Sequence, residues 1–136
     1  MGETERDTAF EPQTRPGIRP EPRPSIRVVR SGEREDWNPL VDPPGRIPSG
    51  GRDLEVFSAQ GGSISTGFWE REPDTWSFER PYDEMALILQ GDADIVTDDG
   101  RTLTVGPGDL LITPKGSAGT WVIRETIAKF WVIHDE

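Results

Sequence analysis

Hydrophobic and polar residues alternate in short runs along most of this chain. Alternation over about four to eight positions is typical of half-buried β-strands. No segment keeps a helical period for about three turns, so we predict an all-β sandwich or barrel. The strands are expected at residues 26–30, 54–59, 63–70, 84–89, 93–97, 102–105, 109–113, 119–124 and 127–134.

Turn residues separate these expected strands at regular spacing. Asp99-Gly100 lies between two alternating segments, which is a strong hairpin signal. The segment between residues 70 and 83 shows no clear run and is expected to be a loop. The remaining separators are Gln60-Gly61-Gly62, Gln90-Gly91-Asp92, Gly106-Pro107-Gly108 and Lys115-Gly116.

The N-terminal quarter has a different composition. Residues 1–25 are polar and rich in proline and arginine, so we expect an extended arm rather than a helix or central strand. Residues 26–136 are expected to form one domain. Within it, residues 31–52 carry several Pro and Gly residues and predict a long loop that covers or wraps the domain.

Charge and composition narrow the range of functions. The chain has a net charge of -10 and no cysteine, which excludes disulfides and thiolate zinc sites. An acidic surface repels a phosphate backbone, so no nucleic-acid partner is expected. No apolar run nears the roughly 20 residues of a membrane helix, and a soluble cytoplasmic protein is expected. The acidity either serves solubility or favours a cationic substrate.

Two segments carry a resemblance to a known superfamily. Glu84 and Gly91 are separated by six residues, and Gly108-Asp109 is followed by Pro114-Lys115-Gly116. This frame resembles the two cupin motifs. With Trp69-Glu70, Trp121 and Lys129, it is similar to the small RmlC-like cupins of the ureidoglycine aminohydrolase and ethanolamine-utilisation Q type. The resemblance implies a double-stranded β-helix, or jelly-roll barrel, that is commonly a dimer, and it does not fix an activity.

The metal ligands of the usual cupin are missing from this frame. Two histidines would precede the glutamate and a third would follow the second glycine. Here the first positions hold Ser77, Phe78, Glu79 and Arg80, and the last holds Gly119. His134 is the lone histidine, so we expect no transition metal and no other cofactor. Acidic residues between Glu70 and Glu84 leave open an oxygen-only Mg²⁺ or Ca²⁺ site.

Glu84 is the leading candidate for chemistry. Alternation places it on one strand face with Ala86 and Ile88, where it would point to the mouth of the barrel. There it could act as a general acid or base, or it could be a structural carboxylate held by internal partners. Glu70 and Lys129 are expected to tune or orient it, although an outward lysine would be only a solvated charge.

Aromatic residues supply the expected ligand contacts. Trp69, Trp76 and Trp121 fall on or beside barrel strands and could form a flat-walled pocket, with Arg80 and Tyr82 as further substrate-binding residues. Ordinary core packing of the tryptophans is the alternative. Because Gly119 takes the histidine position, Trp121 should face inward.

These features predict a small-molecule enzyme that works without a transition metal, as a lyase, isomerase or hydrolase. The alternative is a non-catalytic metabolite-binding or accessory module. The two differ in whether Glu84 faces open pocket volume. We further expect a homodimer in which the arm takes part, because residues 1–30 hold six arginines and the rest of the chain is strongly acidic. Proline also lowers the entropic cost of docking the arm.

Overall fold

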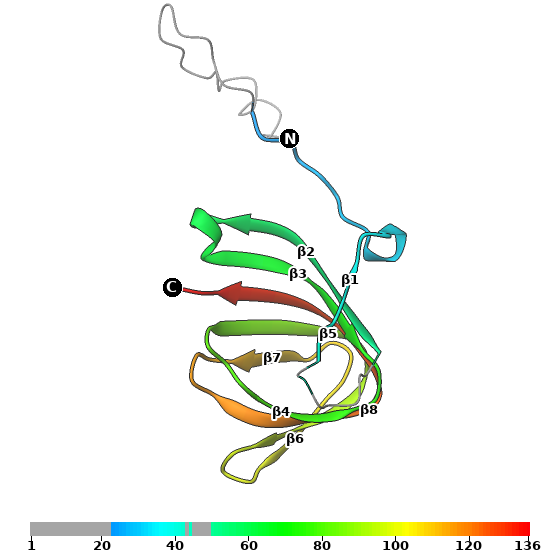
Figure 1. Ribbon diagram of the computed structural model, residues 1–136, viewed down its shortest axis with the longest axis vertical. Helices are drawn as coiled ribbons and strands as arrows, with labels where there is room; N and C mark the ends of the chain where they lie inside the picture. The colour runs from blue at the N-terminus through cyan, green and yellow to red at the C-terminus, as the bar shows by residue number, and fades with distance from the viewer. Residues whose placement is uncertain (1–22, 43, 45–49) are drawn as a thin grey trace, which may run out of the picture.

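The computed structural model describes residues 23–42, 44 and 50–136. These residues form an all-β barrel (Figure 1). Two single 3-10 turns, Ser31–Glu33 and Gln60–Gly62, are the helical elements among the described residues. The strands are β1 (Asn38–Pro39), β2 (Gly51–Ala59), β3 (Ile64–Arg71), β4 (Thr75–Glu79), β5 (Asp83–Thr97), β6 (Thr102–Val105), β7 (Leu110–Thr113) and β8 (Ala118–His134).

Two long antiparallel strands, β5 and β8, organise the barrel. The first half of β5 pairs with the second half of β8. On its other edge this half of β5 pairs with β7, and this half of β8 pairs with β3. The second half of β5 pairs with the first half of β8. On its other edge this half of β5 pairs with β6, and this half of β8 pairs with β4. Each long strand therefore belongs to both sheets of the jelly roll, and in Figure 1 β2 and β3 lie on the opposite side of the barrel from β4 and β6.

The bend between the two sheets depends on a glycine. The β5–β8 register shifts between Ile88 and Ala93. Gly91 lies in this irregular stretch with φ 104°, and a Cβ there would lie 2.2 Å from the backbone oxygen of Thr126. Glycine alone accepts this combination of positive φ and close backbone approach. This explains why a turn signal at residues 90–92 marks a bend within one strand.

The core lies between the two sheets. Its buried residues alternate with outward ones along β5 and β8, as strand geometry requires. Glu84, Ala86 and Ile88 are buried and face inward, as the alternation along their strand predicted. Trp121 is 1% exposed, and its predicted inward orientation is also confirmed. The core cluster is Ile88, Ala93, Ile95, Val105, Leu111, Trp121, Ile123 and Ile127.

Three strand predictions are corrected. Residues 26–30 are extended but pair with no strand, and Ile26 and Val28 are exposed. A single apolar run makes no strand without a neighbouring ladder. The expected loop contains β4, whose alternation of Trp76 and Phe78 with polar residues we missed. The four segments at 84–89, 93–97, 119–124 and 127–134 merge into β5 and β8.

The segment before β2 follows the barrel surface as expected of a wrap. Asn38 and Pro39 pair with β2, and the Leu40 amide donates to the Gly51 oxygen at 3.1 Å. Residues 1–22, 43 and 45–49, which include nearly all of the expected arm, lie outside the described residues. The described part of the chain has no helix long and apolar enough to span a membrane.

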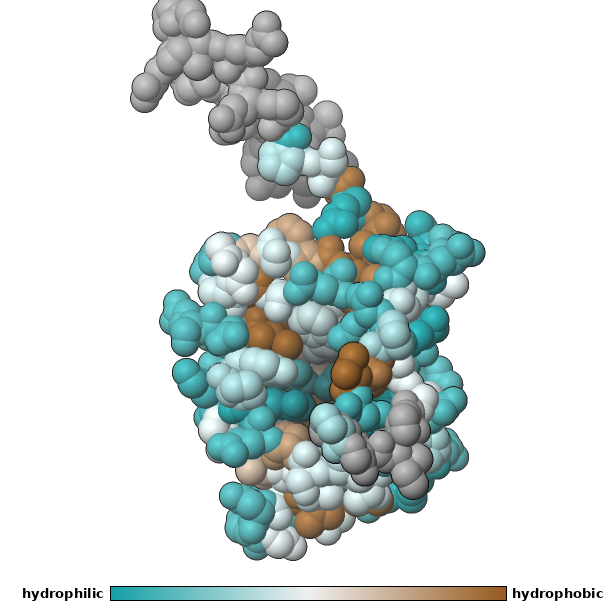
Figure 2. All heavy atoms as spheres, viewed as in Figure 1, coloured by the Kyte–Doolittle hydropathy of each residue, from teal (hydrophilic) through white to brown (hydrophobic). Residues whose placement is uncertain are grey.

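The surface is unevenly polar. Figure 2 shows that the face seen in Figure 1 is mostly hydrophilic, with separate hydrophobic patches. Five large apolar side chains point outward from the first half of β5 and from β7, and their exposed fractions range from 38% to 59%. We call them the apolar sheet face: Met85, Leu87, Leu89, Leu110 and Ile112.

Candidate functional site

The barrel encloses a cavity of about 330 Å³ at one end. Its walls come mainly from the inward faces of β2, β3, β5 and β8, together with β4 and the residues just before β5. The lining combines three carboxylates, three cations and four tryptophans, and is therefore both charged and aromatic. The residues are Asp53, Glu55, Ser65, Trp69, Arg71, Trp76, Arg80, Tyr82, Glu84, Trp121, Lys129, Trp131 and Ile133.

Strand register explains why these side chains meet. Asp53 is the cross-strand neighbour of Trp69, which in turn neighbours Lys129. Directly opposed residues in antiparallel strands point to the same face. One row of the sheet thus carries a carboxylate, an indole and an ammonium group side by side. Gly67 lies between the Trp69 and Ser65 positions of β3, where a Cβ would be 2.7 Å from the Trp131 ring.

Glu84 and Lys129 form a buried ion pair at the cavity wall. Lys129 Nζ donates to Glu84 Oε2 at 2.8 Å, and the two residues are 4% and 5% exposed. A guanidinium nitrogen of Arg80 lies 3.5 Å from the same oxygen. Oε1 of Glu84 has no hydrogen-bond partner among the described residues. The carboxylate is therefore held by internal partners through one oxygen and left available through the other.

Lys129 is the most strongly buried cation of the site. Burial lowers its pKa, Glu84 opposes this shift, and the nearby Arg80 charge adds to it. Nζ lies 4.5 Å from the centroid of the Trp69 ring and 5.6 Å from that of Trp121, so two indole rings pack beside the amino group. The predicted inward orientation and ion pair of Lys129 are present in the structure.

Arg80 and Tyr82 lie where the sequence placed them, at the cavity. Arg80 Nε donates to Thr113 Oγ1 at 3.0 Å, and its guanidinium lies 4.5 Å from the Phe78 ring. Burial raises the pKa of Tyr82, and the Glu84 charge raises it further. Tyr82 is therefore a neutral hydroxyl at neutral pH and can donate a hydrogen bond to a ligand.

Trp69, Trp76 and Trp121 form one cluster. Their ring centroids are 5.9–6.0 Å apart, and Trp76 stacks on Trp121 at an interplanar angle of 13°. Trp121 belongs to the core, whereas Trp69 and Trp76 are partly buried against it. Both roles considered for the tryptophans are thus present, because the cluster is packed as core on one side and lines the cavity on the other.

Comparisons with known proteins place the chain in a family. The model of the EutQ-like cupin domain matches residues 58–131, more than half of the chain. The chain belongs to the EutQ-like cupin family. The predicted family and jelly-roll fold are thereby confirmed, and no curated protein matches the sequence.

Solved structures agree on the fold of this EutQ-like cupin. The Clostridium difficile EutQ protein is 24% identical with a TM-score of 0.56, over 64% of this chain and 69% of that one. A putative ethanolamine utilization protein Q from Salmonella typhimurium is 22% identical with a TM-score of 0.56, over 62% and 69%. A Pseudomonas syringae DUF861 protein of unknown function reaches a TM-score of 0.64 at 20% identity, over 71% and 43%.

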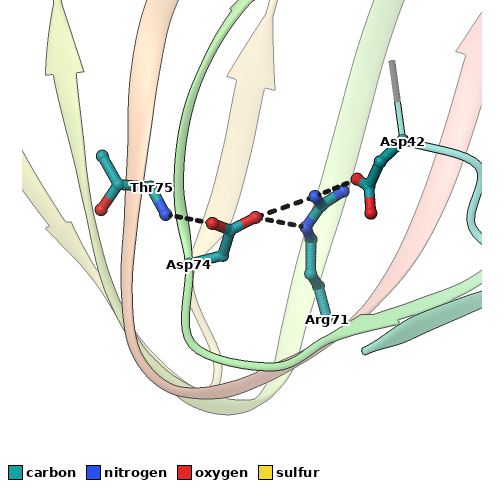
Figure 3. A network of polar contacts seen from close by, with 4 residues as sticks. All are labelled: Asp42, Arg71, Asp74 and Thr75. Carbon is teal, nitrogen blue, oxygen red and sulfur yellow. Dashed lines mark hydrogen bonds and ion pairs between the residues drawn. The ribbon is translucent and has the colours of Figure 1, made fainter. Parts of the chain in front are cut away.

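Arg71 connects the wall of the EutQ-like cupin barrel to the N-terminal wrap. Its Nη2 donates to Asp42 at 2.7 Å and to Asp74 at 2.9 Å, and Asp74 also accepts from the Thr75 amide (Figure 3). The guanidinium carbon lies 4.0 Å from the Trp76 ring centroid. Arg71 therefore fixes both a cavity tryptophan and the part of the wrap that contains Asp42.

Sequence reasoning missed Arg71, Asp53, Glu55 and Trp131 as cavity residues. Asp53 has no side-chain partner among the described residues, and burial raises its pKa. The alternation of β2 around buried Leu54 placed Asp53 and Glu55 on one face. That signal was available, but it did not show that this face turns into the barrel.

Glu70 does not join the site. It points away from the cavity and accepts from Arg52 Nε at 3.0 Å on the outer face of β3. Because Trp69 and Arg71 face inward, the residue between them must face outward. The expectation that Glu70 orients Glu84 is therefore not supported by the geometry, and we leave Glu70 out of the proposed mechanism.

The donor set does not fit the transition metal of the usual cupin. No group of three His, Asp or Glu side chains that could hold a metal ion occurs among the described residues. The cavity carboxylate Glu84 is shared by two cations, Lys129 and Arg80, which oppose a third positive charge. His134 lies at the exposed end of β8, with Nδ1 3.3 Å from Asp83. We therefore derive no step through a metal.

Proposed function

We propose that this EutQ-like cupin domain binds a small molecule in the barrel cavity and performs acid/base chemistry on it without a transition metal. The observation that carries the proposal is the buried Glu84–Lys129 pair in the wall of a cavity of about 330 Å³. Cavities of this size take small metabolites. Paired groups with shifted pKa values are typical of proton-transfer sites.

The free oxygen of Glu84 and the low pKa of Lys129 define the chemistry. The Glu84 carboxylate can take a proton from a bound molecule through Oε1 and return it in a later step, while Lys129 holds the carboxylate in place through Oε2. Tyr82 and Arg80 supply hydrogen-bond donors for a developing oxyanion. Isomerisation, elimination and hydrolysis all need such a transfer, and the tryptophan cluster forms an aromatic wall beside it.

A ligand screen tests this proposal. We expect thermal-shift responses to one class of small metabolites that persist in the presence of a metal chelator. Ser65→Phe should abolish them by filling the cavity, and Ser77→Phe, on the exposed face of β4, should not. Responses that need added divalent metal, or that survive Ser65→Phe, would argue against a metal-independent cavity site.

A specific observation also favours the accessory alternative, in which the domain assembles as a dimer. The apolar sheet face carries no charged residue, and its cross-strand pairs Met85–Ile112 and Leu87–Leu110 form a continuous surface. Two copies of a chain with net charge -10 can meet there without placing like charges together. We propose a second copy of the chain as its occupant.

Light scattering tests the dimer. The full chain is expected to be dimeric at micromolar concentration, and Ile112→Glu is expected to make it monomeric because a carboxylate would be buried at the contact. Arg101→Glu, at an exposed hairpin, makes the charge more negative by two units and should leave the dimer intact. A chain starting at Ser25 tests the arm, which we expect to stabilise the contact. A monomeric full chain would disprove the dimer.

A further inference from the structure

The use of lysine in this chain is selective. Lys115 and Lys129 are its two lysines, and the other thirteen basic residues are arginines. Lys115 is exposed at a turn, whereas Lys129 is 4% exposed at the cavity. Arginine suits a buried ion pair better than lysine, because its guanidinium is planar, weakly hydrated and always charged. A lysine at the buried position therefore points to a role that a permanent cation cannot perform.

The surroundings of Lys129 favour its neutral amine. The ammonium is dehydrated among Trp69 and Trp121, and Arg80 places a second positive charge near it. Lysines become nucleophilic when they are desolvated or when another cation lies nearby. Nζ makes one hydrogen bond, to Glu84, among the described residues. The amine is thus positioned next to a proton acceptor and next to the cavity.

We propose that Lys129 is a nucleophilic amine that forms an imine with a small aldehyde or ketone, and that Glu84 carries the protons of this reaction. The inference rests on the proposed function, since it uses the same cavity and the same pair. It adds the substrate class, a carbonyl compound, and a covalent bond to Nζ. The space of about 330 Å³ is large enough for a small carbonyl metabolite.

The Glu84–Lys129 pair can supply and accept every proton that imine formation requires. Glu84 first takes a proton from the Lys129 ammonium, which leaves a neutral amine beside a carboxylic acid. The amine nitrogen forms a bond to the carbonyl carbon, the carbonyl oxygen takes the Glu84 proton, and the nitrogen returns a proton to Glu84. Glu84 then protonates the hydroxyl of the carbinolamine, which leaves as water while the C=N bond forms. No oxidant or further reactant is needed.

Neighbouring groups fit a carbonyl compound that carries a carboxylate. Arg80 and Tyr82 lie on the Glu84 side of the cavity and can donate to a carboxylate or to the carbonyl oxygen. Arg71 is already shared by Asp42 and Asp74. We therefore choose pyruvate as the charged probe and acetaldehyde as the neutral one.

Borohydride trapping tests the imine on the full, untagged chain. The protein is incubated with each probe and cyanoborohydride, and the labelled sites are mapped by peptide mass spectrometry. Lys115 and the N-terminal amine are internal references in the same sample. The lowered pKa of Lys129 raises the fraction of its neutral amine, so we expect Lys129 to be labelled faster than Lys115.

Three further samples make the outcome decisive. Ser65→Phe should block labelling of Lys129 and leave Lys115 unchanged. Glu84→Gln should slow labelling of Lys129 alone, because loss of the acid that expels water from the carbinolamine outweighs the larger amine fraction. Lys129→Arg should leave only the two reference sites. Labelling of Lys129 no faster than Lys115 with either probe would overturn the inference. If small molecules still give thermal shifts in that case, the proposed function stands without the imine. If no small molecule gives a thermal shift, both the proposed function and the imine are disproved.

Discussion

Replacing Glu84 with glutamine is expected to lower the free energy of unfolding by about 3–5 kcal/mol at neutral pH, the usual cost of removing one partner of a buried ion pair. Lys129 is 4% exposed, and its one hydrogen bond among the described residues is to the lost carboxylate. Arg80 would lose the same counter-charge. Urea unfolding monitored by tryptophan fluorescence measures the loss. If the variant and wild type unfold at the same urea concentration, the pair does not stabilise the fold.

The stability lost in Glu84→Gln should depend on pH, because Lys129 titrates differently in the folded and unfolded chains. Its folded pKa is lowered from 10.5, so between the folded pKa and 10.5 the unfolded chain binds more protons, and stability rises with pH. Glu84→Gln removes the group that opposes this lowering and widens the window. The deficit should therefore be largest near neutral pH and shrink as pH approaches 10.5.

A double variant separates charge from packing. Glu84→Gln with Lys129→Met removes both charges and keeps similar volumes, so it should recover most of the lost stability. If it is as unstable as the single variant, the loss comes from packing around residue 84 and not from the unpaired ammonium.

The fold followed from the sequence because local and global signals agree in this chain. Alternation around Glu84 gave the inward face of β5, and the motif glycines at 91 and 108 marked the places where the barrel bends or turns. Alternation cannot show that a strand continues through a glycine. That is why β5 was predicted as two strands, and β8 was likewise divided at the polar pair Glu125-Thr126.

The site was predictable only in part, for a related reason. Trp121 was placed inward because Gly119, two positions before it, takes a histidine position of the cupin frame, and Trp69 and Lys129 were expected at the site because they belong to the pattern that carries the family resemblance. Asp53 and Arg71 have equally regular positions, but their importance comes from strand pairing between β2, β3 and β8. Pairing between residues more than fifteen positions apart cannot be read from the local pattern. Glu70 could have been excluded from the sequence alone. It is adjacent to Trp69 on one strand, so when Trp69 faces inward, Glu70 must face outward.

Arg71→Met is expected to have the second large effect, also about 3–5 kcal/mol of stability. Asp42 and Asp74 share the Arg71 guanidinium, and the side chains of Arg71 and Asp42 are 8% and 6% exposed. Methionine keeps the aliphatic volume but leaves two carboxylates beside each other in a dehydrated place (Figure 3). The lost contacts joined the barrel to the part of the wrap that contains Asp42.

The loss should therefore appear both globally and at one place in the chain. Urea unfolding gives the total, and hydrogen exchange at the Leu40 amide, which donates to Gly51, reports release of the wrap from β2. Glu70→Gln is the control for an exposed ion pair, because Glu70 pairs with Arg52 at 3.0 Å and their side chains are 33% and 46% exposed, while Arg52 keeps its contact with Trp37 in the wrap. An exposed pair of this kind contributes about 0–1 kcal/mol. Equal losses in the two variants would show that burial of the Arg71 network adds nothing, whereas a large loss with unchanged exchange at Leu40 would place its role inside the barrel.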